Sequence, residues 1–179
     1  TEVSEVTVTR ITRLVKAAAP AVALLCMLAP LAPGATAAPK VTSSKVGAWE
    51  VLCATEGQSS ICKMRQNVAF AGTNKTVLNW LLGYGKDGAL ASTVYVPNGV
   101  RLDTGLDVKW PASGSQNFKY DSCTKKSGCS ATVALPKELL SGKAGKKKVE
   151  FTFYDAAKKP YVYSLSLNGF DKAAAKIKP

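Results

Sequence analysis

The side chains best suited to chemistry in this sequence are cysteines, because the 179 residues include five cysteines and no histidine. Four of them form two sequence-close pairs, Cys53 with Cys62 and Cys123 with Cys129. Such thiols can exchange with other disulfides, bind zinc or form structural disulfides. Neither pair has the Cys-x-x-Cys spacing of a redox site, and zinc would need all four sulfurs at spacings that suit it poorly. The sequence therefore predicts structural disulfides.

Loop geometry selects between the three pairings that four cysteines allow, and it favours the two local ones. The segments 56–60 and 124–128, which separate the paired cysteines, have the composition of turns. We therefore predict two hairpins, each closed by one disulfide. On the chain-entropy estimate each short loop stabilises the fold by roughly 2 to 3 kcal/mol.

Two neighbouring carboxylates, Asp103 and Asp107, could form the acid and base pair of a glycoside hydrolase. Acids four residues apart around a glycine more commonly cap turns or face water. A chain without histidine has no Ser-His or Cys-His nucleophile, and it lacks the commonest metal ligand. We therefore predict a non-enzymatic protein with no catalytic residue, no metal site and no cofactor.

Lysines are the remaining candidates for binding chemistry. The run at 143–148 is the most distinctive, and a second pair lies within the predicted turn of the second disulfide hairpin. A lysine run can be a solvated loop, a contact for a polyanion or protection for a sheet edge, and the sequence leaves all three open. The candidate anion-binding residues are Lys143, Lys146, Lys147, Lys148, Lys125 and Lys126.

The first 37 residues have the features of an export signal. Arg10, Arg13 and Lys16 precede an apolar run from Ala17 to Leu31, and small residues at 35–37 suit cleavage after Ala37. The run is short and contains two prolines, which disfavours a membrane-spanning helix. Cys26 follows a leucine rather than the small residue of a lipoprotein signal, so we interpret it as part of the leader. We predict that residues 38–179 form one exported domain.

The net charge narrows the class of partner but does not select one. Removing three basic and two acidic leader residues from totals of 24 and 12 leaves 21 and 10, a charge of about +11. Such a charge favours anionic partners, for example lipopolysaccharide, an acidic glycan, nucleic acid or an anionic lipid surface. Base stacking needs aromatic side chains among the basic ones, and the tyrosines near the lysine run alternate toward the apolar side. We therefore expect no specific nucleic-acid partner, while peripheral membrane association stays open.

Alternation of apolar and polar residues with a period of two dominates the rest of the chain. Met64, Val68 and Phe70 share one phase with Cys62, and residues 63, 65 and 67 take the opposite phase. Residues 147–154 and 161–167 form a hairpin, whereas Cys123 is out of phase with the strand before it and requires a bend. Short helices are expected at 137–141 and 171–177. The fold class is all-β, an antiparallel β-sandwich with one or two short helices and two local disulfides.

Several short motifs, in their order and spacing, resemble the invasion-associated locus B proteins that alphaproteobacteria export. The resemblance covers almost all of residues 38–179. Its motifs are Trp49-Glu50-Val51-Leu52-Cys53, Cys62-Lys63-Met64-Arg65-Gln66, Val96-Pro97-Asn98-Gly99-Val100, Leu102-Asp103-Thr104-Gly105, Tyr120-Asp121-Ser122-Cys123, Gly128-Cys129-Ser130-Ala131, Ser166-Leu167-Asn168-Gly169-Phe170 and Ala173-Ala174.

The resemblance implies a small periplasmic or envelope-associated β-sandwich with a link, in some pathogens, to entry into host cells. It carries over no catalytic residue. Together with the residue patterns, it predicts an envelope protein of a Gram-negative bacterium that acts in the periplasm, at the outer envelope or outside the cell. Its expected partner is an envelope component or another protein. The alternative function is binding of a polyanion through the lysine-rich loops.

Overall fold

The computed structural model describes residues 38, 40–142, 145 and 147–179. The predicted leader at 1–37 lies outside the described residues, as do Lys143 and Lys146, so the export signal stays a prediction. Among the helices of the described residues, none has the length and apolarity needed to cross a membrane.

The larger of two antiparallel sheets has seven strands in the order β1-β2-β3-β4-β5-β9-β8. Alternation of apolar and polar residues makes β2 to β5 and β9 strands, because successive side chains point to opposite faces, whereas the edge strands β1 and β8 are exposed and form by pairing with their neighbours. The strands are β1 (Lys40–Val46), β2 (Trp49–Glu56), β3 (Ser59–Ala69), β4 (Thr76–Tyr84), β5 (Leu90–Val96), β8 (Ser122–Thr124) and β9 (Gly128–Thr132).

The smaller sheet has four strands in the order β11-β10-β6-β7. They are β6 (Leu106–Trp110), β7 (Gly114–Phe118), β10 (Lys148–Tyr154) and β11 (Pro160–Ser166). The β10–β11 pair confirms the predicted hairpin, with Lys148 opposite Ser166 and Tyr154 opposite Pro160. Lys158 and Lys159 lie in its turn, at the end remote from Lys148.

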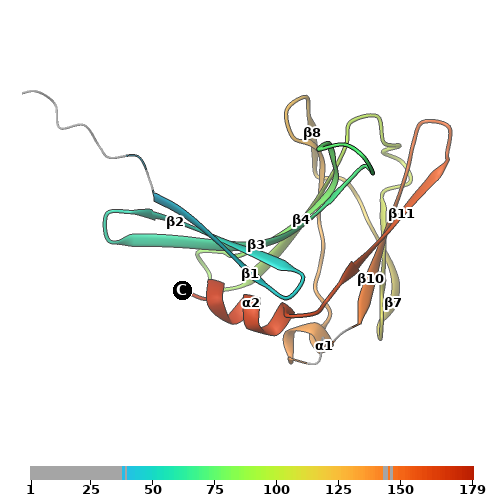
Figure 1. Cartoon of the computed structure of the whole chain (residues 1–179). Helices are drawn as coiled ribbons and strands as arrows, with labels where there is room; N and C mark the ends of the chain where they lie inside the picture. The colour runs from blue at the N-terminus through green and yellow to red at the C-terminus, as the bar shows by residue number, and fades with distance from the viewer. Residues whose placement is uncertain (1–37, 39, 143–144, 146) are drawn as a thin grey trace, which may run out of the picture. The chain divides into compact units, whose positions relative to one another are not determined.

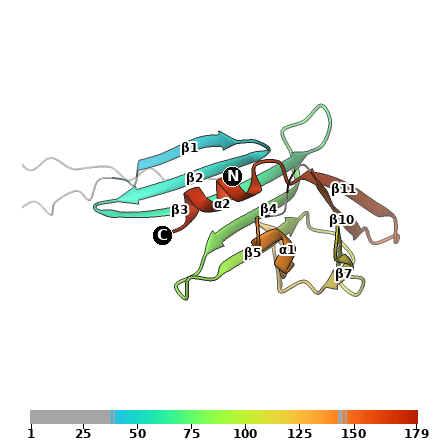
Figure 2. The same cartoon turned by 90° about the horizontal axis from the view of Figure 1, so that it is seen from below.

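Both predicted helices are present. The helix α1 (Lys137–Leu140) begins after Pro136 and buries Leu139. The helix α2 (Phe170–Ile177) buries Phe170, Ala173 and Ile177, which lie on one helical face. This face covers β1, β2 and β3 (Figures 1 and 2).

The chain crosses between the sheets several times, and one crossing explains the odd phase of Cys123. The strand β7 belongs to the smaller sheet and β8 to the larger one. The segment from Lys119 to Asp121 makes the change, so alternation is not continuous from Phe118 to Cys123. The predicted bend is confirmed as a change of sheet.

An aromatic cluster joins the two sheets. Trp80 of β4 is fully buried, and its ring centroid lies 5.0 Å from that of Phe151 in β10 and 5.0 Å from that of Trp49 in β2. Its indole nitrogen donates a hydrogen bond of 2.8 Å to the hydroxyl of buried Ser92. This donor and acceptor satisfy one another, whereas the buried indole nitrogen of Trp49 has no hydrogen-bond partner in the described chain. The core therefore lies between the facing sheets, which is the predicted β-sandwich.

The disulfides follow the strand register. Cys53 pairs with Cys62 between β2 and β3, and Cys123 pairs with Cys129 between β8 and β9. Both predicted bonds are therefore cross-strand links within hairpins.

The assignment of Phe70 to the same phase as the buried Met64 is wrong. The pairing of β3 with β4 shifts between Val68 and Ala69, and β3 ends at Ala69. Phe70 lies beyond the strand and its side chain is 43% exposed. A bulge breaks the period of two, so a phase extrapolated through it fails.

Candidate binding site on the outer face of the larger sheet

The larger sheet has a second face, directed away from the core, on which polar side chains form an ordered row. Strand register aligns Asn67 of β3, Asn79 of β4, Tyr95 of β5, Ser130 of β9 and Ser122 of β8. These residues alternate along their strands with core residues such as Trp80 and Val94. We call this surface the outer face.

A depression in the outer face, which we call the outer hollow, has a volume of about 690 Å³. That volume lies within the range of roughly 300 to 1,000 Å³ that is typical of ligand pockets. It is open rather than enclosed. Its floor contains Asn67, Asn79, Leu81 and Tyr95, and its rim includes Lys75, Asn98, Lys125 and Lys126.

The charge of the outer hollow is positive. Among the described residues that line it, four are basic (Arg65, Lys75, Lys125 and Lys126) and none is acidic. Of these four basic residues, Arg65 has its charge paired, because its Nε donates a 2.8 Å hydrogen bond to the Glu50 carboxylate. That bond, followed by one from Ser43, lowers the pKa of the Glu50 carboxyl.

The three lysines form no ion pair within 4.0 Å with any carboxylate of the described residues. Their charges are therefore compensated only by solvent and its ions. Concave surfaces lined by one sign of charge concentrate the field and raise the local concentration of counter-ions. The outer hollow is thus a concave, positively charged surface whose three lysines have no carboxylate partner among the described residues.

One polar atom of the floor is also unpaired. The Oδ1 of Asn79 is buried and has no hydrogen-bond partner within the described part of the chain. A buried carbonyl oxygen without a partner is costly, and such atoms in native proteins usually bind water or a ligand. Asn79 therefore has an unsatisfied acceptor just beneath the floor of the outer hollow, out of direct contact with solvent.

The hairpin from β8 to β9, which carries Lys125 and Lys126, is fixed against the end of β5. The Asn98 Nδ2 donates to the carbonyl oxygens of Thr124, at 3.0 Å, and Lys125, at 3.4 Å. Gly128 has φ +77°, and a Cβ there would overlap the Val96 carbonyl. With the Cys123–Cys129 bond closing its base, the hairpin holds its lysines at the rim. We call it the latched hairpin.

The predicted lysine cluster does not gather at one place. Lys125 and Lys126 line the outer hollow, whereas Lys147 lines a separate small pocket and Lys148 begins β10 in the other sheet. Lys143 and Lys146 lie outside the described residues. The described candidates therefore belong to at least two surfaces, because Lys125 and Lys126 lie on the larger sheet, whereas Lys147 and Lys148 lie at the start of a strand of the smaller sheet.

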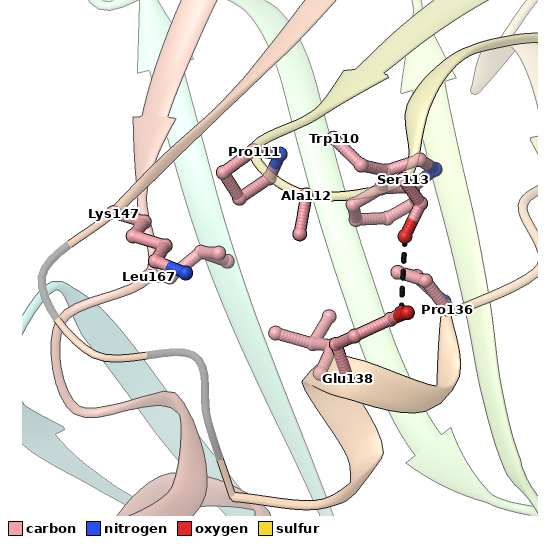
Figure 3. Close-up of a pocket in the computed structure, with 9 residues that line it drawn as sticks. Trp110, Pro111, Ala112, Ser113, Pro136, Glu138, Lys147 and Leu167 are labelled. Atoms are coloured by element: carbon pink, nitrogen blue, oxygen red, sulfur yellow. Dashed lines mark hydrogen bonds between the residues drawn. The ribbon is translucent and has the colours of Figure 1, made fainter.

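The pocket that contains Lys147 is small and mostly apolar (Figure 3). Ser113 donates a 3.0 Å hydrogen bond to Glu138 across it, which ties α1 to the turn between β6 and β7. The pKa of Glu138 is lowered by a bond from its own backbone amide and then by that of Ser113. These contacts give the pocket a role in packing.

Asp103 and Asp107 have separate partners. Arg101 binds Asp103, and this hydrogen bond is the main cause of the lowered pKa of Asp103. Asp107 accepts from Asn117 at 2.7 Å and from the Tyr154 hydroxyl at 3.0 Å. Asp107 therefore ties β6 to both of its neighbours, β7 and β10. No group of three or more potential metal-binding His, Cys, Asp or Glu residues occurs in the described ranges.

The fold and these motifs agree with one family. The model of the family described as Invasion associated locus B (IalB) protein matches residues 49–178. The chain belongs to this family. The resemblance of the cysteine, tryptophan and glycine motifs to the invasion-associated locus B proteins is thereby confirmed.

The chain is also similar to proteins from two bacteria, and the names of these proteins refer to invasion. Two invasion protein B homologs of Brucella abortus, from strain 2308 and from biovar 1 strain 9-941, are each 27% identical over 130 residues. That match covers 72% of this chain and 75% of each relative. The crystal structure of invasion associated protein b from Bartonella henselae has the same fold, with a TM-score of 0.63 and 18% identity, covering 76% of this chain and 94% of that one.

Sequence reasoning missed most of the outer hollow. Alternation already assigns Arg65 and Asn67 to the face opposite the core, but no pattern indicates that β4 and β5 lie beside them with Asn79 and Tyr95. The available signal was that polar residues occupy one phase of several strands. That signal does not say which strands are neighbours, so it could not bring these residues together.

Proposed function

We propose that this member of the invasion associated locus B family is an exported, non-enzymatic envelope protein that binds an envelope component or another protein and contributes to host-cell entry. The observation that carries the binding proposal is the outer face, where a row of polar side chains from neighbouring strands borders an open, positively charged hollow. Family membership and the invasion protein names of the Brucella and Bartonella relatives support the link to entry.

The non-enzymatic part rests on the chemistry of the available side chains. The four cysteines of the described residues are in disulfides, and the chain has no histidine to activate a nucleophile. Asp103 and Asp107 are each committed to a different neighbour. This distribution suits structural ties better than an acid and base pair.

The envelope location rests on the cysteines and the predicted leader. Disulfides persist in oxidising compartments such as the bacterial periplasm and are rare in the cytosol. Two cross-strand bonds in one small domain are therefore what we expect of an exported protein.

The test of this proposal is made in cells. The gene is deleted and restored, cell fractions are alkylated without reduction, and host-cell entry is counted. We expect the protein in the envelope fractions with its paired cysteines unreactive, and entry to fall in the deletion strain. A reduced cytoplasmic protein, or unchanged entry, would contradict the proposal.

A crosslinking arm locates the binding surface. A photoreactive residue replaces Tyr95 on the outer face or, as a control, Lys172 on the exposed side of α2. We expect an adduct with an identified envelope component from position 95 and none from position 172. Equal adducts from both positions would argue against a specific outer-face contact.

The alternative function, polyanion binding through lysine-rich loops, is favoured by one observation. Lys125 and Lys126 lie together at the rim of a hollow with no acidic lining residue in the described chain. Steep loss of affinity with salt would distinguish this function from an apolar or neutral contact. The share of Lys143 and Lys146 in it remains a prediction.

A further inference from the structure

We infer that the outer hollow binds an acidic polysaccharide, with sugar rings over the floor at Tyr95 and Asn79 and acid groups at Lys75, Lys125 and Lys126. The inference rests on the proposed function in taking the outer face as the binding surface, and it adds the chemistry of the ligand.

The rim provides the anionic part of this recognition. Lys75 precedes β4 and the other two lysines occupy the latched hairpin, so positive groups from separate segments border one depression. Each lysine ammonium is a compact charge with three donors and suits a carboxylate or sulfate group. Their lack of ion pairs in the described chain leaves them available.

The floor provides the carbohydrate part. Asn67 is exposed, and its amide can both donate to and accept from sugar hydroxyls. Asn79 is half-buried beside it, with its Oδ1 beneath the surface and unsatisfied in the described chain. Tyr95 adds an aromatic ring with a polar end, which can contact the apolar face of a sugar ring. Ligand pockets usually fix the orientation of the bound molecule with a few polar groups placed around aromatic side chains.

The rim is already ordered before any ligand binds. The Asn98 hydrogen bonds and the close approach of Gly128 to Val96 hold the latched hairpin on β5. Binding therefore does not have to order the backbone that carries Lys125 and Lys126, which reduces its entropic cost.

The same features disfavour two other polyanions. Single-stranded nucleic acid is normally bound by several aromatic side chains that stack successive bases, and Tyr95 is the one aromatic residue lining the hollow in the described chain. A flat membrane surface would meet the rim lysines but would not need Asn79 and Tyr95, so the floor residues distinguish a glycan from a membrane. An extended glycan chain can enter such a depression.

The main experiment measures binding of the full, disulfide-bonded chain to a heparin oligosaccharide of defined length by calorimetry at several salt concentrations. We compare Lys125→Gln/Lys126→Gln with the matched control Lys172→Gln/Lys176→Gln, which makes the same charge change on α2. We expect at least about tenfold weaker binding and a shallower salt dependence for the first variant, and less than about twofold change for the control.

A second variant tests the floor without changing charge. Asn79→Ala removes the amide, and we expect about fivefold weaker binding to the oligosaccharide with an unchanged salt slope. Amide NMR shifts of Asn67 and Tyr95 on titration provide a readout that needs no variant. Thermal unfolding of every variant checks that the fold is intact.

Four outcomes would overturn the inference. They are equal losses in the hairpin and α2 variants, no effect of Asn79→Ala, tighter binding of single-stranded DNA or phosphatidylglycerol vesicles than of heparin, and equal binding of neutral dextran. Each would leave the cell-entry and fractionation results unaffected, so failure of this inference is distinguishable from failure of the proposed function.

Discussion

The two disulfide hairpins use the same covalent link in different settings. In the β2–β3 hairpin, a Cβ added at Gly57 would have nothing within 4 Å, and the neighbouring Ile61 is 67% exposed. In the latched hairpin, a Cβ at Gly128 would overlap the Val96 carbonyl, and Asn98 binds two carbonyl oxygens of the turn. The strands of both hairpins pair with neighbouring strands. The turn of the second is in addition attached to the end of β5 and the loop after it, and no such attachment of the first turn occurs in the described chain.

This difference teaches that the bond alone does not determine what a hairpin does. A cross-strand disulfide restrains the pairing of two strands in either case. Only the additional contacts to β5 place the turn lysines beside the outer hollow. We therefore expect loss of either disulfide to lower the stability by similar amounts. Changes at Gly128 or Asn98, where the latched hairpin contacts the end of β5, should lower it more than the matching changes in the β2–β3 hairpin.

The largest difference is expected between Gly128→Ala and Gly57→Ala. Both glycines have positive φ, +77° and +59°, so each substitution costs about 1 kcal/mol or more of unfolding free energy. At Gly128 the overlap with Val96 adds strain, and we expect a total loss of about 3 to 4 kcal/mol. Urea unfolding of both variants measures these losses of unfolding free energy. Equal losses would show that the close contact of Gly128 with Val96 does not contribute to stability.

Loss of either disulfide is expected to have the next largest effect. Sequence separations of 9 and 6 residues between the cysteines give similar loop entropies, so Cys53→Ala/Cys62→Ala and Cys123→Ala/Cys129→Ala should each lose about 2 to 3 kcal/mol of stability. The heparin affinity should fall only in the second variant. A loss of affinity in the first variant as well would mean that the β2–β3 hairpin also shapes the site.

A smaller effect is expected from Asn98→Ala. The substitution removes the side-chain donor to Thr124 and Lys125, and we expect about 1 kcal/mol lower stability together with weaker heparin binding. The control is Gln58→Ala in the exposed turn of the β2–β3 hairpin, with a change below about 0.5 kcal/mol. Thermal unfolding and calorimetry provide both values, and an Asn98 variant that matches the control would contradict the latch.

The smallest effect at neutral pH is expected from Tyr120→Phe, just before the latched hairpin. Burial, and then the charge of Asp107, raises the pKa of Tyr120 to about 12, and its hydroxyl has no partner in the described chain. Removing that hydroxyl should change stability at pH 7 by less than about 1 kcal/mol.

The pH dependence of the same variant sharpens this prediction. A folded pKa above the unfolded value of about 10 means that the neutral tyrosine stabilises the fold fully below pH 10 and progressively less as the pH rises toward 12. Tyr120→Phe should lack this loss, and titration at 295 nm should show one fewer tyrosine ionising near pH 12. An unchanged titration curve would contradict the assignment.

The sequence predicts the local structure well because its signals are local. Alternation, turn composition and cysteine spacing give both hairpin disulfides, the β10–β11 pair and both helices. The interruption at Phe70 was missed, since a bulge has no marker in a single sequence. The strand β1 was also missed, because Lys40 to Lys45 are exposed and show no apolar alternation.

The outer hollow could not be predicted because it depends on which strands become neighbours. Asn67, Asn79 and Tyr95 come from three strands, and their alignment follows from the register. The lysine run at 143–148 attracted the prediction because lysines adjacent in sequence are easy to see. The lysines that line the hollow, Lys75, Lys125 and Lys126, come together only through the order of the sheet.

The contact between α2 and β2 also bears on how the chain reaches its final state. The ring of Phe170 lies 5.4 Å from that of Trp49, so the last helix covers one of the first aromatic residues of the domain. Synthesis from the amino end makes Trp49 long before α2, and until α2 packs against it the ring has only its contact with Trp80 within this cluster. Closure of this part of the core therefore waits for α2, and in the interval the incompletely covered tryptophan is a surface that a holding chaperone can bind.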